Sequence, residues 1–166
     1  MNEEEYIRKD RLRFTKNSLA STFAIIAIVF DVLYFLNIYN SDVHYTVGDF
    51  YYQIRIGGSI ILNLLFMLAA FLASEGIKNY KISYGYLLAV LGVVQIVRIF
   101  ILPMQAHNAE VTVAGTTSKV MGTGQFITVI VYLALSAAAC FAAAYVGIKK
   151  SRELESHMAS LGLNAA

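Results

Sequence analysis

The sequence predicts an all-α integral membrane protein, a bundle of four transmembrane helices with both termini in the cytoplasm. Three observations support this fold class: the composition, four long apolar segments, and a one-sided distribution of Lys and Arg. Hydrophobic residues make up 58% of the chain and charged residues 14%, whereas soluble domains average roughly 45–50% and 25%. The 166 residues are expected to form a single membrane domain with no separate soluble catalytic domain.

Four segments are apolar over enough residues to cross a hydrocarbon core of about 30 Å, at a helical rise of about 1.5 Å per residue. They are residues 19–39, 56–74, 82–104 and 125–148. The first segment follows a charged head, and no small-residue cleavage site marks its end. We therefore expect a retained span and no cleaved signal peptide.

The distribution of Lys and Arg predicts the orientation of the spans. Of the thirteen such residues, Arg55 and Lys119 fall on one side of the spans and Arg98 falls inside one. All others lie in the head, in the short turn between spans two and three, or in the tail. Because cytoplasmic segments are enriched in Lys and Arg, we expect the ends, residues 1–17 and 149–166, to be cytoplasmic. The short loops and the absence of a cleaved leader or a glycosylation sequon favour a bacterial cytoplasmic membrane.

The connecting segments suggest local structure but no catalytic or metal chemistry. The tail places Leu154, Met158 and Leu161 at helical spacing, which indicates a helix lying on the inner membrane surface or a docking face for a partner. Residues 105–124 alternate in polarity and predict a short hairpin that turns at residues 115–118. Two loose pairs, Asp42 with His44 and His107 with Glu110, lack the spacing of a metal site, so neither a metal ion nor another cofactor is expected.

A layer of polar residues is expected inside the bundle. Measured along each helix from the predicted cytoplasmic end, Asp31 lies at about 18 Å and Gln95 at about 20 Å, with Arg98 one turn higher. Asn63 and Tyr132 fall at a similar depth. All four spans therefore contribute a polar group to one slab of the bilayer.

Charged groups in a span cost about 2.5–3.5 kcal/mol at its centre, so they usually face the bundle interior and find partners. We expect Asp31 to pair with Arg98; the alternative is that Arg98 extends outward to the membrane surface. The layer has two interpretations. It fixes the helix register by interhelical hydrogen bonds, or it forms a site in which the carboxylate carries a proton and Arg98 holds an anionic group.

The fourth span is rich in small residues, with Ser136, Cys140 and Ala144 at four-residue intervals. Such a face lets another helix approach closely. The neighbouring helix is the first or third span of the same chain, or it comes from a second protein or a second copy. Cys140 is the only cysteine, which excludes an intramolecular disulfide and a CxxC redox pair.

The sequence carries no GxSxG, HExxH or P-loop pattern and no basic block typical of nucleic-acid binding, so neither an enzyme nor a nucleic-acid partner is expected. The first functional hypothesis is a non-enzymatic accessory, regulatory or structural subunit of a larger membrane complex. The alternative is a small homodimeric proton-coupled transporter that uses Asp31. Small multidrug-resistance transporters also have four short spans and an acidic residue in the first, but their loops are shorter and the acidic residue is a glutamate.

Overall fold

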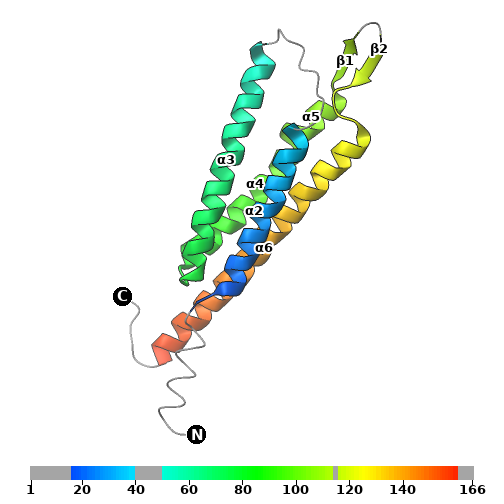
Figure 1. Cartoon of the computed structure of the whole chain (residues 1–166). Coiled ribbons are helices and arrows are strands. Elements are labelled where there is room, and N and C mark those ends of the chain that lie inside the picture. Colours follow the sequence, from blue (N-terminus) through cyan, green and yellow to red (C-terminus); the bar gives the residue numbers. More distant parts are fainter. Residues whose placement is uncertain (1–15, 40–49, 114–115, 161–166) are drawn as a thin grey trace.

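The computed structural model describes residues 16–39, 50–113 and 116–160. Four of its helices are long and apolar enough to cross a membrane, which bears out the all-helical prediction and indicates a membrane location. They are α2 (Ser18–Tyr39), α3 (Phe50–Lys78), α4 (Ile82–Ile101) and α6 (Thr123–Ser160), arranged as a bundle (Figure 1). A short helix α5 (Pro103–Asn108) and two strands, β1 (Glu110–Val113) and β2 (Thr116–Lys119), connect α4 to α6.

The helices differ from the predicted spans mainly at their ends. α2 agrees with residues 19–39, whereas α3 extends beyond residues 56–74 in both directions. Apolar composition stops at the first polar residue, but backbone hydrogen bonds continue until a residue leaves the helical conformation. α4 ends before Pro103, which lacks a backbone N–H and starts α5 instead.

The turn between α3 and α4 is a C-terminal capping motif with an unusual residue. Lys81 N–H donates to the carbonyl of Gly76 at 3.2 Å, and Tyr80 N–H donates to Ile77 at 3.1 Å. This pair of bonds places Tyr80 at the left-handed position, with φ of 59°, where glycine is usual. Burial raises the pKa of the Tyr80 phenol, and the carboxylate of Glu153 in α6 raises it further.

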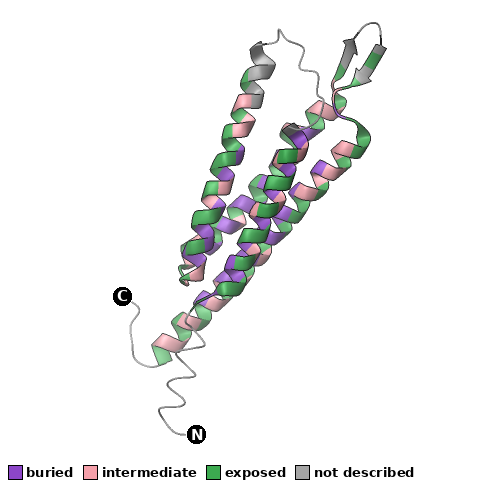
Figure 2. Cartoon of the chain, in the orientation of Figure 1, coloured by how far each residue is buried: buried purple, intermediate pink, exposed green. Residues whose placement is uncertain are grey.

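Small residues hold the helices together at the end of the bundle where α2 starts and α3 ends, which we call the termini end. Ala20 and Ala24 of α2, Ala73 of α3, and Ala143 and Ala144 of α6 are all buried in one apolar cluster. Glycines allow the same close approach, since a Cβ on Gly147 would lie 2.4 Å from Cγ1 of Ile77. Buried positions follow the sides of the helices that face one another (Figure 2).

At the opposite end, which we call the hairpin end, α3 leans away from the other helices (Figure 1). A Cβ on Gly57 or Gly58 would meet no other atom within 4 Å. At Gly76, near the other end of α3, a Cβ would lie 2.2 Å from the ring of Tyr84. α3 therefore packs less closely at Gly57 and Gly58 than at its termini end.

The connection at the hairpin end contains the predicted hairpin. β1 and β2 are antiparallel, and Glu110 pairs with Lys119. The chain reverses between Val113 and Thr116, earlier than the predicted turn at 115–118. His107 stacks on Phe126 with ring centroids 4.3 Å apart, and its Nδ1 lies 3.2 Å from the carbonyl oxygen of Met121.

The tail is a direct continuation of the fourth span. α6 continues without a break from the bundle to Ser160, so residues 149–160 prolong the fourth span along its own axis. The predicted stripe residues Leu154 and Met158 are part of this extension, and Leu161 lies outside the described residues.

Candidate functional site

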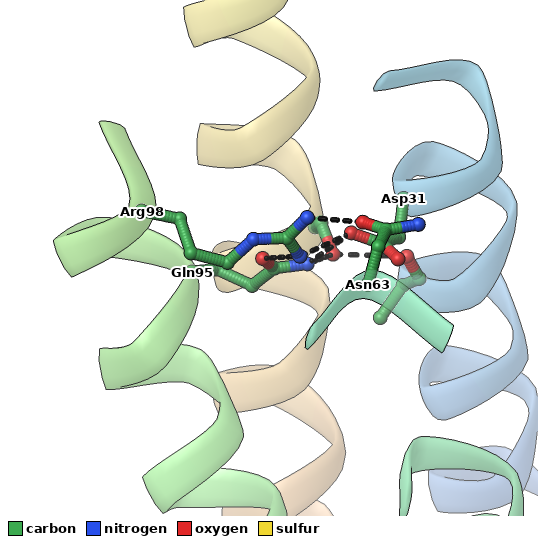
Figure 3. A network of polar contacts seen from close by, with 6 residues as sticks. Asp31, Asn63, Gln95 and Arg98 are labelled. Atoms are coloured by element: carbon green, nitrogen blue, oxygen red, sulfur yellow. Dashed lines mark hydrogen bonds and ion pairs between the residues drawn. The ribbon is translucent and has the colours of Figure 1, made fainter. Parts of the chain in front are cut away.

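The predicted polar residues of three helices meet inside the bundle. Asp31 comes from α2, Asn63 from α3, and Gln95 and Arg98 from successive turns of α4. Their side chains point toward one another (Figure 3). Asp31, Asn63 and Gln95 have no exposed surface, and Arg98 is 9% exposed. We call these four residues together with Ser136 of α6 the polar network.

Arg98 is the donor at the centre of the polar network. Its Nη1 donates to Oδ1 of Asp31 and to Oε1 of Gln95, both at 2.7 Å. Its Nη2 donates to Oδ1 of Asn63. The guanidinium thus pairs with the carboxylate and does not extend to the surface, which decides between the two conformations considered for Arg98.

Gln95 extends the polar network to the fourth helix. Its Nε2 donates to Oδ1 of Asp31 at 2.9 Å and to Oγ of Ser136 at 2.8 Å. Ser136 then donates to the backbone carbonyl of Ala27 in α2 at 2.9 Å. Every long helix is joined to at least one other by these bonds, so a shift of any of them along its neighbour breaks at least one bond.

Two aromatic rings flank the guanidinium. The Cζ atom of Arg98 lies 4.7 Å from the ring centroid of Tyr34 and 5.6 Å from that of Phe66. Cation–π contacts of this kind stabilise a charged group that has left water. The rings come from α2 and α3, so they add two further contacts across the same helices.

Two unpaired polar atoms and a cleft lie beside these bonds. Oδ2 of Asp31 and Nδ2 of Asn63 are buried and have no hydrogen-bond partner in the described part of the chain. A cleft of about 180 Å³ opens next to Arg98 on the side of the hairpin end. Its lining comes from α2, α3 and α4: Tyr34, Gly58, Ser59, Leu62, Arg98, Ile101 and Leu102.

Tyr132 does not join the polar network. It is half-buried and packs against an apolar cluster around Tyr34, Val129 and Leu133, one turn closer to the hairpin end. Ser136 supplies the α6 contact in its place. The two residues are four apart and share a face of α6, so depth is what separates them: counted from residue 148, Ser136 lies at about 18 Å and Tyr132 at about 24 Å. The missed signal is that Ser136 matches the depth of Asp31 more closely.

The predicted packing face of α6 is filled by the chain itself. Cys140 is buried in a cluster with Ala27 of α2, and Ala144 is buried in the cluster that contains Ala20 and Ala24. Ser136 is also completely buried. Of the neighbours considered for this face, the structure brings α2 of the same chain against it.

The weaker candidates for a metal site fall partly outside the described residues. Within residues 16–39, 50–113 and 116–160, no group of three or more His, Cys, Asp or Glu side chains gathers in one place. Asp42 and His44 lie outside the described residues. Glu75 pairs with Lys78 at 3.2 Å near the end of α3.

Comparisons with known proteins give no relative. No family model matches the chain, and neither the curated proteins nor the solved structures contain a match. Any functional conclusion therefore rests on the described residues themselves, on the polar network and on the length of α6. Its charged atoms neutralise each other and its hydrogen bonds run between helices, which suits a structural clamp more directly than a binding pocket.

Proposed function

We propose that this protein is a non-enzymatic accessory subunit that anchors in the cell membrane through its four helices and binds a larger membrane protein through the extension of α6. The accumulation of Lys and Arg in the head, in the α3–α4 turn and at the end of α6 supports an orientation with the termini end in the cytoplasm. In that orientation the extension of α6 lies in the cytoplasm.

The observation that carries this proposal is the uninterrupted length of α6. α2 begins at Ser18, and Asn17 before it is bonded to the carbonyl of Lys78 at the end of α3 at 2.9 Å. α6 passes this level and remains helical to Ser160, projecting beyond the other helices (Figure 1). The twelve residues from Lys149 to Ser160 correspond to about 18 Å of helix.

The extension has an apolar side that continues the buried face of α6. Gly147 and Ser151 are buried inside the bundle, and Leu154 and Met158 follow them at intervals of three and four residues. Residues at this spacing share one face of a helix. An apolar stripe on an otherwise charged helix is the pattern by which amphipathic helices bind in the groove of a partner.

The polar network supports the same role. Its interhelical hydrogen bonds are each worth about 0.6–2 kcal/mol in a membrane bundle. They join α2, α3, α4 and α6 into one unit from which the extension projects. A rigid anchor with a projecting helix is suited to holding a partner in place.

The experiment is the mass and composition of the native particle, with an affinity tag at the N-terminus so that α6 stays unmodified. After gentle extraction, we expect a larger membrane protein at fixed stoichiometry. The double variant Leu154→Ser/Met158→Ser is expected to lose this protein. The matched control Ala159→Ser, an exposed position that is three or four residues from neither of them, is expected to keep it. A particle made of this chain alone, or capture that is equal in all three forms, contradicts the proposal.

One observation favours the second candidate, a proton-coupled transporter. Oδ2 of Asp31 has no partner among the described residues, and Arg98 lines a cleft beside it. A carrier predicts that Asp31→Asn abolishes pH-dependent uptake into membrane vesicles while the protein stays as abundant as the wild type. The subunit proposal predicts instead that Asp31→Asn lowers abundance and thermal stability together.

A further inference from the structure

A second face of α6 forms a groove at the termini end, away from the stripe of Leu154 and Met158. Tyr145, Lys149, Arg152 and Ser156 follow at intervals of four, three and four residues and share this face. With Ile148 and Glu153 they line an open cavity of about 620 Å³. We propose that this groove binds the headgroup of an anionic glycerophospholipid in the leaflet next to the termini end.

The start of α4 lies next to two residues of the groove, Ile148 and Arg152. Ile148 packs over Gly85, where a Cβ would lie 2.6 Å from its Cγ1, so the two helices are close together at this level. Nη2 of Arg152 donates to the phenol oxygen of Tyr86 at 3.3 Å. This bond draws the guanidinium back from the free end of α6 toward the span, to the level of the first turns of α4.

The charges of the groove suit a phosphodiester. Lys149 and Arg152 each carry a positive charge against the single negative charge of Glu153, which leaves the lining net positive. Lys149 is the first charged residue after the apolar part of α6. A cation at this position lies where phospholipid phosphates are found, and basic pockets between helices at the cytoplasmic surface bind anionic headgroups.

The remaining lining suits a lipid more than a free anion. Tyr145 is 69% exposed and Tyr86 is 50% exposed, and both lie within about one turn of the charged residues. Tyrosine rings gather at this depth because they have an apolar body and a polar tip. Ile148 gives the groove an apolar floor next to the lipid-facing side of the span. The cavity has room for many water volumes of about 30 Å³ each, and so for a headgroup with the start of its acyl chain.

The chain offers a matched control for diffuse electrostatic attraction. Lys150 is adjacent to Lys149 and carries the same charge, but it does not line the groove. Near an anionic membrane surface, one Lys or Arg contributes roughly fivefold to binding. A specific site therefore predicts unequal effects for two neighbouring lysines, whereas diffuse attraction predicts equal ones.

The test uses the purified full chain in detergent, with phosphatidylglycerol, phosphatidylcholine or inorganic phosphate added separately. Bound lipid is counted by native mass spectrometry. We expect phosphatidylglycerol to bind the wild type. We expect Lys149→Gln and Arg152→Gln each to weaken its binding roughly fivefold, with Lys150→Gln close to the wild type. All three positions are partly or fully exposed, and unchanged thermal unfolding without lipid verifies the fold.

Three outcomes would overturn the proposal. Equal losses for Lys149→Gln and Lys150→Gln would show diffuse attraction only. Equal binding of phosphatidylcholine would show an apolar groove that does not recognise charge, and competition by inorganic phosphate at similar concentration would show a free-anion site. Because the stripe of Leu154 and Met158 lies on another face, loss of a protein partner and loss of lipid are expected from different variants.

Discussion

At the termini end, alanines and glycines bring α2, α3, α4 and α6 into contact, whereas nearer the hairpin end the same helices meet through the polar network. The first region depends on shape: Ala20, Ala24, Ala143 and Ala144 are all buried in one cluster. The second depends on directed bonds, with Arg98 joined to Asp31 at 2.7 Å and a cleft of about 180 Å³ left beside it.

The difference shows what each region tolerates. Close packing of small side chains has no space for an added atom, and the buried polar groups of this region are uncharged amides and hydroxyls. The polar network tolerates unfilled space beside it, but loss of one partner leaves a buried charge without compensation. Substitutions that remove a charge and substitutions that add a methyl group are therefore expected to act on opposite ends of the bundle.

The largest effect is expected from Arg98→Leu, which leaves Asp31 buried without its cation. Breaking a buried ion pair lowers the free energy of unfolding by about 3–5 kcal/mol. Cys140 supplies the measurement, because it is the only cysteine and is completely buried. We expect its thiol to react with a maleimide dye at a lower temperature in the variant than in the wild type.

The control for this prediction is the double variant Asp31→Leu/Arg98→Leu. Replacing both charges by apolar side chains removes the uncompensated charge, so much of the stability is expected to return. If Arg98→Leu melted like the wild type, the polar network would not hold the helices and the comparison between the two regions would fail.

The second largest effect is expected from Gly147→Ala at the termini end. The new methyl group would lie 2.4 Å from Cγ1 and 2.5 Å from Cδ1 of Ile77, which is itself completely buried. Overpacking of this kind lowers the free energy of unfolding by about 1–3 kcal/mol. The same Cys140 labelling measures it, with Gly57→Ala as the control at a position where the Cβ meets nothing.

A rescue variant identifies the cause. Ile77→Ala added to Gly147→Ala removes the side chain that clashes, so the pair is expected to be more stable than the sum of the single effects predicts. Simple addition of the two losses would contradict the argument that shape complementarity limits this region.

These two regions were not equally accessible from the sequence. The four spans follow from composition, and the pairing of Asp31 with Arg98 follows from the energy of burying charge. Both can be inferred from the residues that fall within each span. Counting the helical rise along each span also placed Asn63 and Gln95 at the level of Asp31. The predicted layer named Tyr132, whereas the contact with α6 is made by Ser136, one turn closer to the termini end and nearer the depth of Asp31.

The ends of the helices were predicted less accurately than the spans, because they depend on backbone hydrogen bonds. The continuation of α3 to Lys78 depends on the capping bonds of Tyr80 and Lys81, with Tyr80 in the left-handed conformation that glycine usually adopts. Nothing in the residue type predicts that placement. The straight extension of α6 likewise follows from continuous backbone hydrogen bonds, whereas the spacing of Leu154, Met158 and Leu161 indicated only an apolar stripe, on a membrane-surface helix or on a docking face.

A smaller effect is expected from the one described hydroxyl pair at the termini end. Oγ of Ser21 lies 2.8 Å from Oγ of Ser74, and Ser74 also donates to the carbonyl of Ser21 at 3.3 Å. In Ser21→Ala this second bond remains, so Ser74 keeps a partner. We expect a loss of about 0.6 kcal/mol in the free energy of unfolding, typical of a hydrogen bond between membrane helices. A loss as large as that of Arg98→Leu would show that this end also depends on polar contacts.

The smallest effect is expected from leucine at the two adjacent glycines of α3. Both positions are open at the Cβ, but only Gly58 lines the cleft next to Arg98. Leucine at position 58 is expected to pack against Leu62, Ile101 and Leu102 and to raise the free energy of unfolding by about 0.5 kcal/mol, as small cavity-filling changes do. Leucine at position 57 is expected to leave the free energy of unfolding unchanged.

Because both variants add the same side chain to the same helix, a gain confined to Gly58→Leu reports filling of the cleft alone. Equal destabilisation by both would mean that α3 lies against the other helices at the hairpin end, and the contrast between a closely packed region and an open one would not hold there.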